Sequence, residues 1–145
     1  MANHKILLVE DNHDDIDLAR YASESGRLNV DLVVARDGEE ALEYLFATGR
    51  HVGRAVADYP VVVILDLGLP GISGLDVLRA IRQRAETKII PVVILSGSDR
   101  ASDIVEGYDL GANSFVHKPD NLDDFSSLVA QLERYWVLTN LRPSV

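Results

Sequence analysis

The chain has 145 residues, of which 47% are hydrophobic and 26% are charged. This length and composition fit one compact globular domain and exclude a disordered or fibrous chain. The formal net charge is −9 and there is no cysteine, which disfavours direct contact with nucleic acid or an anionic membrane and excludes disulfides and thiolate metal sites.

Short apolar runs alternate along the chain with stretches of helical spacing. The runs cover residues 6–9, 32–35, 61–65, 90–95 and 114–117. Several are nearly continuous and rich in Val and Ile, as are strands buried on both faces of a parallel sheet. Apolar side chains recur three and four positions apart within residues 41–46, 75–81, 104–108 and 122–132, which predicts helices. The alternation predicts an α/β fold, a doubly wound five-stranded parallel sheet with helices on both faces.

Other local signals complete the outline of the chain. Asp37 followed by Glu40 predicts a capping box at a helix start. Residues 49–60 form a long connection before the third strand, and residues 136–145 run past the expected end of the last helix. We therefore expect a single domain over residues 1–145, with a core at about 5–135 and a C-terminal extension at about 136–145. The N-terminus enters a short strand without a long apolar stretch, so we expect a cytoplasmic protein.

Polar residues follow four of the five predicted strands. Glu10 and Asp11 follow the first strand, Asp66 the third, Ser96 the fourth and Lys118 the fifth. Ligands of open α/β sheets bind at the carboxyl ends of the strands, so these side chains are expected to converge.

Three crowded carboxylates repel one another unless a cation offsets their charge. Oxygen ligands, with no Cys and no His beside them, favour Mg²⁺. A magnesium ion beside a lysine and a hydroxyl suits stabilisation of a phosphoryl group during transfer, with a carboxylate of the cluster as the nucleophile.

Four stretches of sequence carry a family resemblance. They are residues 6–12, 63–70 with Gly74 following, 91–96 and 111–119. In this order they resemble the receiver domains of bacterial two-component response regulators, and the resemblance spans about residues 5–135. It implies a flavodoxin-like strand order 2-1-3-4-5. It also implies a signalling receiver that assists its own phosphorylation and dephosphorylation and is not an enzyme.

The resemblance implies roles for the acidic residues. Asp66 is the expected phosphoacceptor, and Asp11 and Asp66 are expected to ligate Mg²⁺ directly. Glu10 is expected to act on the metal through water, and the backbone carbonyl of Gly68 to supply a further ligand. Gly68 has no side chain to cover the phosphoryl group, which leaves the lifetime of the phosphoaspartate open.

Further roles follow from the same resemblance. Lys118 is expected to pair with the phosphoryl oxygens, with Pro119 cis after it, and Ser96 to donate its hydroxyl to the phosphate. Phe115 occupies the position of a switching aromatic, without the hydroxyl of the more frequent tyrosine. Phosphorylation then biases a two-state surface around the fourth helix and fifth strand.

The sequence is most similar to small, stand-alone receivers that partner bacteriophytochrome-type histidine kinases. The features are residues 10–12 with Asp15, residues 108–113, and the tail around Tyr135 and Trp136. The similarity implies a sensor histidine kinase as phosphoryl donor and another protein as target. It also implies a homodimer through the last strand, last helix and tail. The tail residues placed in that interface are Trp136, Leu138 and Leu141.

Several alternatives stay open at this point. The chain could be a degenerate receiver that only binds partners. A haloacid-dehalogenase-type phosphatase would need an acid two residues after Asp66, where Gly68 stands. A flavodoxin-like cofactor binder would need a Ser/Thr/Gly-rich phosphate loop after the first strand.

Structural readings also stay open for single residues. Asp11 and Asn12 could merely cap the first helix, and Ser96 could cap the helix that follows the fourth strand. Phe115 could be an ordinary core residue, and the aromatic residues of the tail could cover the last helix of the same domain.

Overall fold

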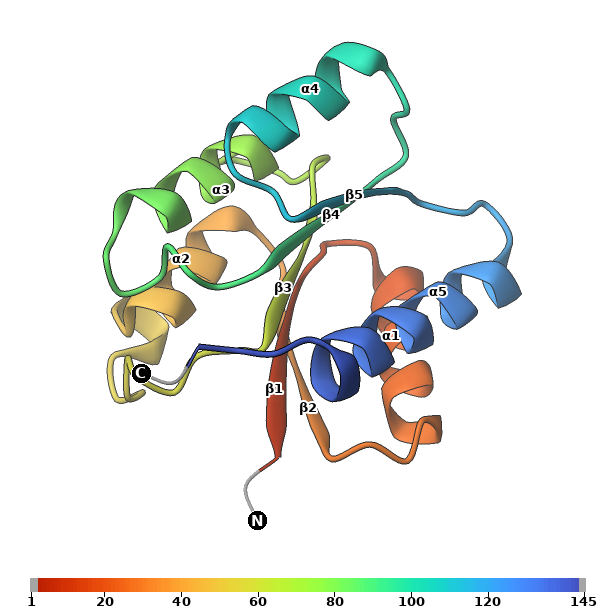
Figure 1. Cartoon of the computed structure of the whole chain (residues 1–145), viewed down its shortest axis with the longest axis horizontal. Coiled ribbons are helices and arrows are strands. Elements are labelled where there is room, and N and C mark those ends of the chain that lie inside the picture. Colours follow the sequence, from red (N-terminus) through yellow and green to blue (C-terminus); the bar gives the residue numbers. More distant parts are fainter. Residues whose placement is uncertain (1–2, 144–145) are drawn as a thin grey trace.

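The computed structural model describes residues 3–143 and contains one parallel sheet between two layers of helices (Figure 1). The strands are β1 (His4–Val9), β2 (Val30–Ala35), β3 (Val62–Asp66), β4 (Val92–Ser96) and β5 (Ser114–His117). The helices are α1 (His13–Ser25), α2 (Gly38–Phe46), α3 (Gly74–Gln83), α4 (Ala101–Asp109) and α5 (Leu122–Arg134). The strand order is β2-β1-β3-β4-β5, which confirms the predicted fold class and topology.

The strand bounds differ slightly from the sequence-based expectation. β1 begins at His4 because His4 and Lys5 pair with Val30 and Asp31 of β2, and backbone pairing does not require apolar side chains. β3 and β4 each extend one residue further than expected, so Asp66 and Ser96 are the last residues of their strands. Both side chains therefore take their direction from the sheet itself.

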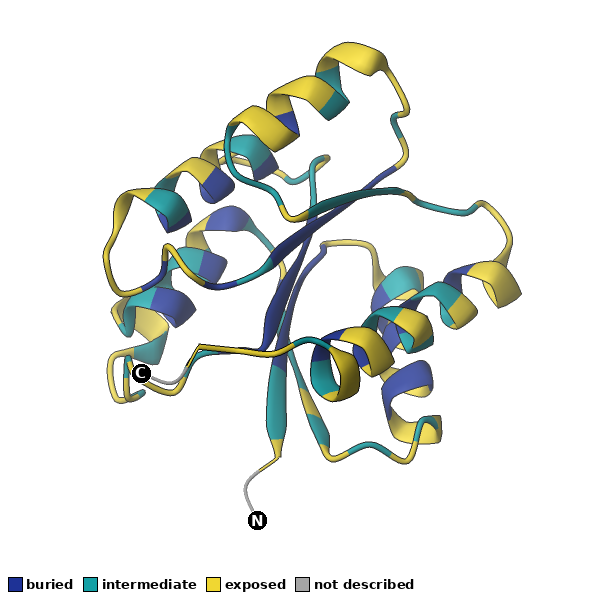
Figure 2. Ribbon diagram, viewed as in Figure 1, coloured by how far each residue is buried: buried dark blue, intermediate teal, exposed yellow. Residues whose placement is uncertain are grey.

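The sheet separates two hydrophobic cores, because successive side chains of a strand point to opposite faces. Leu7 and Val9 of β1 pack towards α2 and α3, in a cluster that includes Leu78. Ile6 and Leu8 pack towards α1 and α5, in a cluster that includes Phe125. The interior strands are buried on both faces (Figure 2), as their continuous apolar runs predict.

Side-chain caps fix where several helices begin. Asn12 accepts a hydrogen bond from the backbone N–H of Asp15 at the start of α1. Asp37 likewise accepts from Glu40 N–H at the start of α2, which confirms the cap predicted there. The return bond of the predicted box differs, because the Glu40 carboxylate accepts from the N–H of Arg36 rather than from Asp37.

The C-terminal extension packs against its own domain. A π-helical segment, Tyr135–Thr139, follows α5 directly, and it carries Trp136 into the core between the sheet and the α1–α5 layer. The chain then runs along the amino-terminal end of the sheet towards the side of α2 and α3 (Figure 1). Within the described part of the chain, every helix is too short or too polar to span a lipid bilayer.

Candidate functional site

Three acidic side chains meet at the carboxyl-terminal end of the sheet. Glu10 and Asp11 follow β1, and Asp66 ends β3, the strand that pairs with β1. One carboxylate oxygen from each lies within 4.8 Å of the others. Such a set of hard, anionic oxygens fits a divalent ion such as Mg²⁺, which offsets the mutual repulsion of the carboxylates. The convergence of these acids, predicted from the strand ends, is confirmed.

Glu10 is the buried member of this acidic cluster. Its Oε2 accepts hydrogen bonds from the backbone N–H groups of Asp11 (3.1 Å) and Asn12 (3.2 Å). Burial is the main cause that raises the pKa of the Glu10 carboxyl, and the nearby charge of Asp66 adds to it; the hydrogen bond from Lys118 opposes both, and the resulting pKa is about 7. The fixed donors orient this carboxylate and leave its second oxygen for Lys118.

Lys118 brings the opposite charge to the same place. Its Nζ donates to Glu10 Oε1 at 2.7 Å and to Asp15 Oδ2 at 3.0 Å, and it lies 3.6 Å from Asp66 Oδ2. Burial by itself lowers the pKa of Lys118, but the hydrogen bond to Glu10 and the charges of Asp66 and Glu10 outweigh it, so the pKa is raised. The ammonium therefore stays charged.

Asp66 is a member of the acidic cluster that also borders an open hollow. Its Oδ1 accepts a hydrogen bond from the backbone N–H of Gly68 at 3.1 Å. The start of α3 packs directly on the backbone here, since a Cβ on Gly74 would lie only 2.5 Å from the carbonyl oxygen of Asp66. A side chain at position 74 would push the helix off the end of β3, so glycine at this position helps to fix the Asp66 backbone.

A hollow of about 390 Å³ opens beside Asp66 between the loops that follow β3 and β4. Its lining residues are Asp66, Leu67, Gly68, Ser73, Leu75, Ser96, Gly97, Ser98, Arg100 and Asp103. Because position 68 has no side chain, the approach to the Asp66 carboxylate from this side is not covered. The hollow thus gives a reactant access to Asp66.

Ser96 contributes a hydroxyl to the wall of this hollow. Its Oγ accepts a hydrogen bond from the N–H of Ser98 at 3.0 Å, which leaves its own proton free to donate elsewhere. The reading of Ser96 as a helix cap is wrong, because α4 begins after Arg100 and has no side-chain cap. The β4–α4 loop separates Ser96 from the helix, so the hydroxyl faces the site.

Phe115 is a partly buried residue of β5, and its ring lies beside α4. It packs against the core on the α2–α3 side, and a Cβ on Gly107 of α4 would lie 3.1 Å from its ring. Its backbone N–H donates to the hydroxyl of Tyr108 at 3.3 Å. α4 is mostly exposed, with Gly107 as its only buried residue (Figure 2), so Phe115 lies where a thinly packed helix meets the sheet.

One expectation about the residues beside the site is corrected, and another holds in part. The peptide bond between Lys118 and Pro119 is trans, as are all peptide bonds in residues 3–143; the expected cis bond is wrong. Trans is the isomer that such bonds intrinsically prefer, and Lys118 reaches the acidic cluster with it. Asn12 does cap α1, but Asp11 beside it belongs to the acidic cluster.

The tail residues divide between the core and the surface. Trp136 is buried against the α1–α5 layer, whereas Leu138 and Leu141 are exposed. Trp136 therefore covers its own domain. Of the three tail residues expected in an interface, Leu138 and Leu141 have side chains that are open to a partner.

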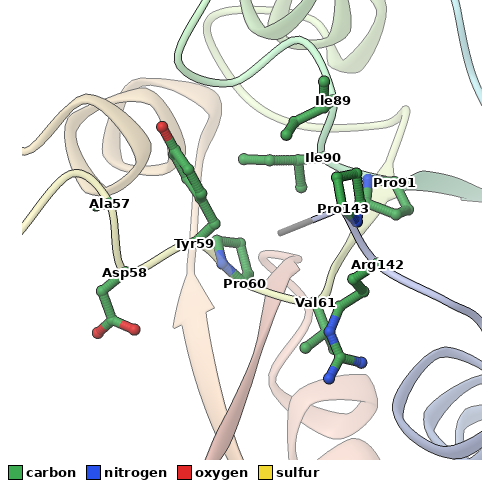
Figure 3. A pocket seen from close by; sticks show the side chains of 10 residues that line it. All are labelled: Ala57, Asp58, Tyr59, Pro60, Val61, Ile89, Ile90, Pro91, Arg142 and Pro143. Atoms are coloured by element: carbon green, nitrogen blue, oxygen red, sulfur yellow. The ribbon is translucent and has the colours of Figure 1, made fainter. Parts of the chain in front are cut away.

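A second hollow, of about 200 Å³, lies at the opposite end of the sheet (Figure 3). It is lined by residues just before β3 and β4 and by the tail. Its charged side chains are already engaged, since Asp58 pairs with Lys5 and Arg142 donates to the backbone oxygen of Trp136. No set of converging free polar groups marks it as a site for chemistry.

Asp15 contacts Lys118, a role that the sequence analysis did not assign to it. It lies in the first turn of α1, where an acid is favourable for the helix dipole alone. Asp11 lies before the Asn12 cap and outside α1, so a helical spacing from Asp11 does not predict where the Asp15 side chain lies. The approach of Asp15 to Lys118 depends instead on the direction in which α1 leaves the sheet.

Comparisons with known proteins agree with this geometry. A model of the family described as the response regulator receiver domain matches residues 6–130. The response regulator Rcp1 of Synechocystis is 33% identical over 139 residues, which cover 96% of this chain and 92% of Rcp1.

Solved structures give the same result. The phosphorylated cyanobacterial phytochrome response regulator RcpA superposes with a TM-score of 0.91 at 38% identity, covering 99% of this chain and all of the other. The Mn²⁺-bound form of Rcp1 has a TM-score of 0.89 at 33% identity, over 97% of this chain and 99% of the other. The bacteriophytochrome response regulator AtBRR has a TM-score of 0.73 at 43% identity, over 96% and 99%.

Proposed function

We propose, since this chain belongs to the response regulator receiver domain family, that it accepts a phosphoryl group on Asp66 from a sensor histidine kinase. The observation that carries the proposal is the position of Asp66: it lies in the acidic cluster, within reach of Lys118, and faces an open hollow. The similarity of this chain to the response regulators of phytochromes supports a bacteriophytochrome-type kinase as the donor of the phosphoryl group.

In the proposed reaction, a carboxylate oxygen of Asp66 forms a bond to phosphorus. The bond between phosphorus and the nitrogen of the donor histidine breaks, and its electron pair stays with the leaving imidazole. The product is an acyl phosphate on Asp66. Lys118 moves from Glu10 and Asp15 towards the new phosphoryl oxygens, and Ser96 donates its hydroxyl to one of them.

Glu10, Asp11 and Asp66, with the carbonyl of Gly68, are the residues we propose to hold Mg²⁺. When bound, the ion supplies positive charge that offsets the charge on the transferred phosphoryl oxygens. A relative described in a Mn²⁺-bound form supports a divalent metal here.

We propose that phosphorylation alters the surface of α4 and β5, since Ser96 and Phe115 join the site to that thinly packed region. A target protein would read this change. The exposed Leu138 and Leu141 are the tail residues available for a homodimer.

The test is intact-mass spectrometry after incubation with acetyl phosphate and Mg²⁺. We expect one phosphoryl adduct on the wild type, the same adduct on Asp14→Asn, in which an exposed acid of α1 is neutralised, and none on Asp66→Asn. Chelation of Mg²⁺ should abolish the adduct. Beryllofluoride binding replaces the phosphoryl adduct if the phosphoaspartate is short-lived.

Labelling of Asp66→Asn at full stoichiometry would contradict the assignment of the acceptor. A wild type that takes neither phosphoryl nor beryllofluoride would instead favour the degenerate, partner-binding receiver.

A further inference from the structure

Lys118 divides its contacts unequally among three carboxylates. Its Nζ donates to Glu10 (2.7 Å) and Asp15 (3.0 Å), but its 3.6 Å distance to Asp66 is too long for a hydrogen bond. We propose that Asp15 is a positioning residue that holds Lys118 away from Asp66, and so tunes both metal binding and phosphoryl acceptance. This inference rests on the proposed function of Asp66.

The position of Asp15 is fixed by the start of α1. Its backbone N–H donates to the Asn12 cap, and the N–H of Asn12 donates in turn to Glu10 Oε2. The same turn therefore sets Glu10 and Asp15 on either side of the ammonium. Asp15 is partly buried, whereas Asp14 and Asp17 beside it are exposed, so Asp15 alone of the three lies at the lysine.

In the unphosphorylated state, this arrangement leaves Asp66 available to a metal. An ammonium has three N–H donors and moves readily towards the nearest negative charge. Without the charge of Asp15, Lys118 would shift from its present position towards Asp66 and compete with Mg²⁺ for the same oxygens. Loss of one negative charge near the acidic cluster also weakens its attraction for a divalent cation.

In the phosphorylation step, the same contact acts in the opposite direction. The phosphoryl oxygens need the ammonium, and Asp15 competes with them for it. An uncharged residue at position 15 would release Lys118 to the incoming phosphoryl group and reduce the repulsion felt by an anionic donor. Asp15 therefore favours metal binding while it slows phosphorylation at saturating metal.

Asp15 is expected to strengthen Mg²⁺ binding and to slow phosphorylation, and these opposite effects provide the test. We would measure Mg²⁺ affinity of the unphosphorylated protein by calorimetry, and the rate of labelling by acetyl phosphate at saturating Mg²⁺. For Asp15→Asn we expect the dissociation constant to rise about fivefold and the labelling rate to rise about threefold. Asp15→Glu, which keeps the charge, should return both values towards those of the wild type.

Asp14→Asn is the matched control, because it removes one acid from the same helical turn and the same dipole interaction. Its two values should stay close to those of the wild type. The inference is overturned if Asp15→Asn behaves like Asp14→Asn, or if weaker metal binding comes with slower labelling, as general damage to the site would produce. The calorimetric comparison needs no phosphorylation. If the wild type fails to label, the proposed function is refuted, and the effect of Asp15 on Mg²⁺ affinity is still decided by calorimetry.

Discussion

Two buried glutamates lie in different regions of the molecule and meet different surroundings. Glu10, at the carboxyl-terminal end of the sheet, and Glu133, between α1 and α5, are each only 1% exposed. Burial raises the pKa of both carboxyls. Glu10 has an ammonium and two backbone N–H groups as partners. In the described part of the chain, the hydrogen-bond partner of the Glu133 side chain is the hydroxyl of Ser23.

The difference teaches what turns a buried acid into part of a chemical site. A buried carboxylate can take part in binding a cation or a phosphoryl group where hydrogen-bond donors and an opposite charge are fixed around it. The end of the sheet supplies them, because several strands and the start of α1 end there together. The α1–α5 seam supplies mainly apolar side chains and one hydroxyl, so Glu133 serves packing.

The largest effect should follow from removing the cation at the sheet end. Lys118→Gln leaves the buried Glu10 beside Asp66 without a compensating charge, and we expect a loss of roughly 2 kcal/mol in the free energy of unfolding. Urea denaturation in chelator measures it. Added Mg²⁺ should restore part of the loss, because the ion can take over the compensation.

Lys5→Gln is the control for this change. Lys5 pairs with Asp58 at the other end of the sheet, where the Asp58 side chain is about half exposed, so its loss should be below about 1 kcal/mol. Equal losses in the free energy of unfolding of the two variants would mean that burial of Glu10 does not increase the contribution of Lys118 to stability.

A smaller effect is expected at the seam. Ser23→Ala removes the hydroxyl that contacts Glu133 and leaves a buried carboxyl without this partner, which should lower the free energy of unfolding by about 1.5 kcal/mol. Ser25→Ala, at the exposed end of the same helix, controls for the gain in helix propensity. If thermal or urea unfolding finds both variants equally stable, the Ser23–Glu133 contact contributes nothing.

The two regions also differ in how far the sequence predicts them. The acidic cluster is predictable because parallel strands end at one edge, so polar residues after Val9, Leu65 and Leu95 must lie near one another. The core strands are predictable because two-sided burial produces continuous apolar runs. These patterns are local, and each depends on only a few neighbouring residues.

The seam depends on contacts that no local pattern encodes. Ser23 and Glu133 are 110 positions apart, and only the packing of α1 on α5 brings them together. Trp136 packs inward because the chain continues as a π-helical segment after Arg134. The spacing of the apolar residues in the sequence does not predict this segment. Asp15 was missed as a partner of Lys118 for the same reason, since its approach depends on the direction in which α1 leaves the sheet.

The smallest effect should be a gain in stability at the seam that depends on pH. Because burial raises the native pKa of Glu133 above its ordinary value of 4.5, the native state holds this proton longer than the unfolded chain does. Stability is therefore lost as pH rises from about 4.5 through the native pKa, and the loss is complete above it.

Glu133→Gln cannot ionise and keeps a group that can hydrogen-bond to Ser23. It should exceed the wild type by ~1 kcal/mol at pH 8 and by almost nothing at pH 4.5. Urea denaturation across this range measures the difference, with Glu24→Gln, an exposed acid of α1, as control. Parallel curves for the wild type and Glu133→Gln would mean that the α1–α5 seam holds an ionised carboxylate at no cost in stability.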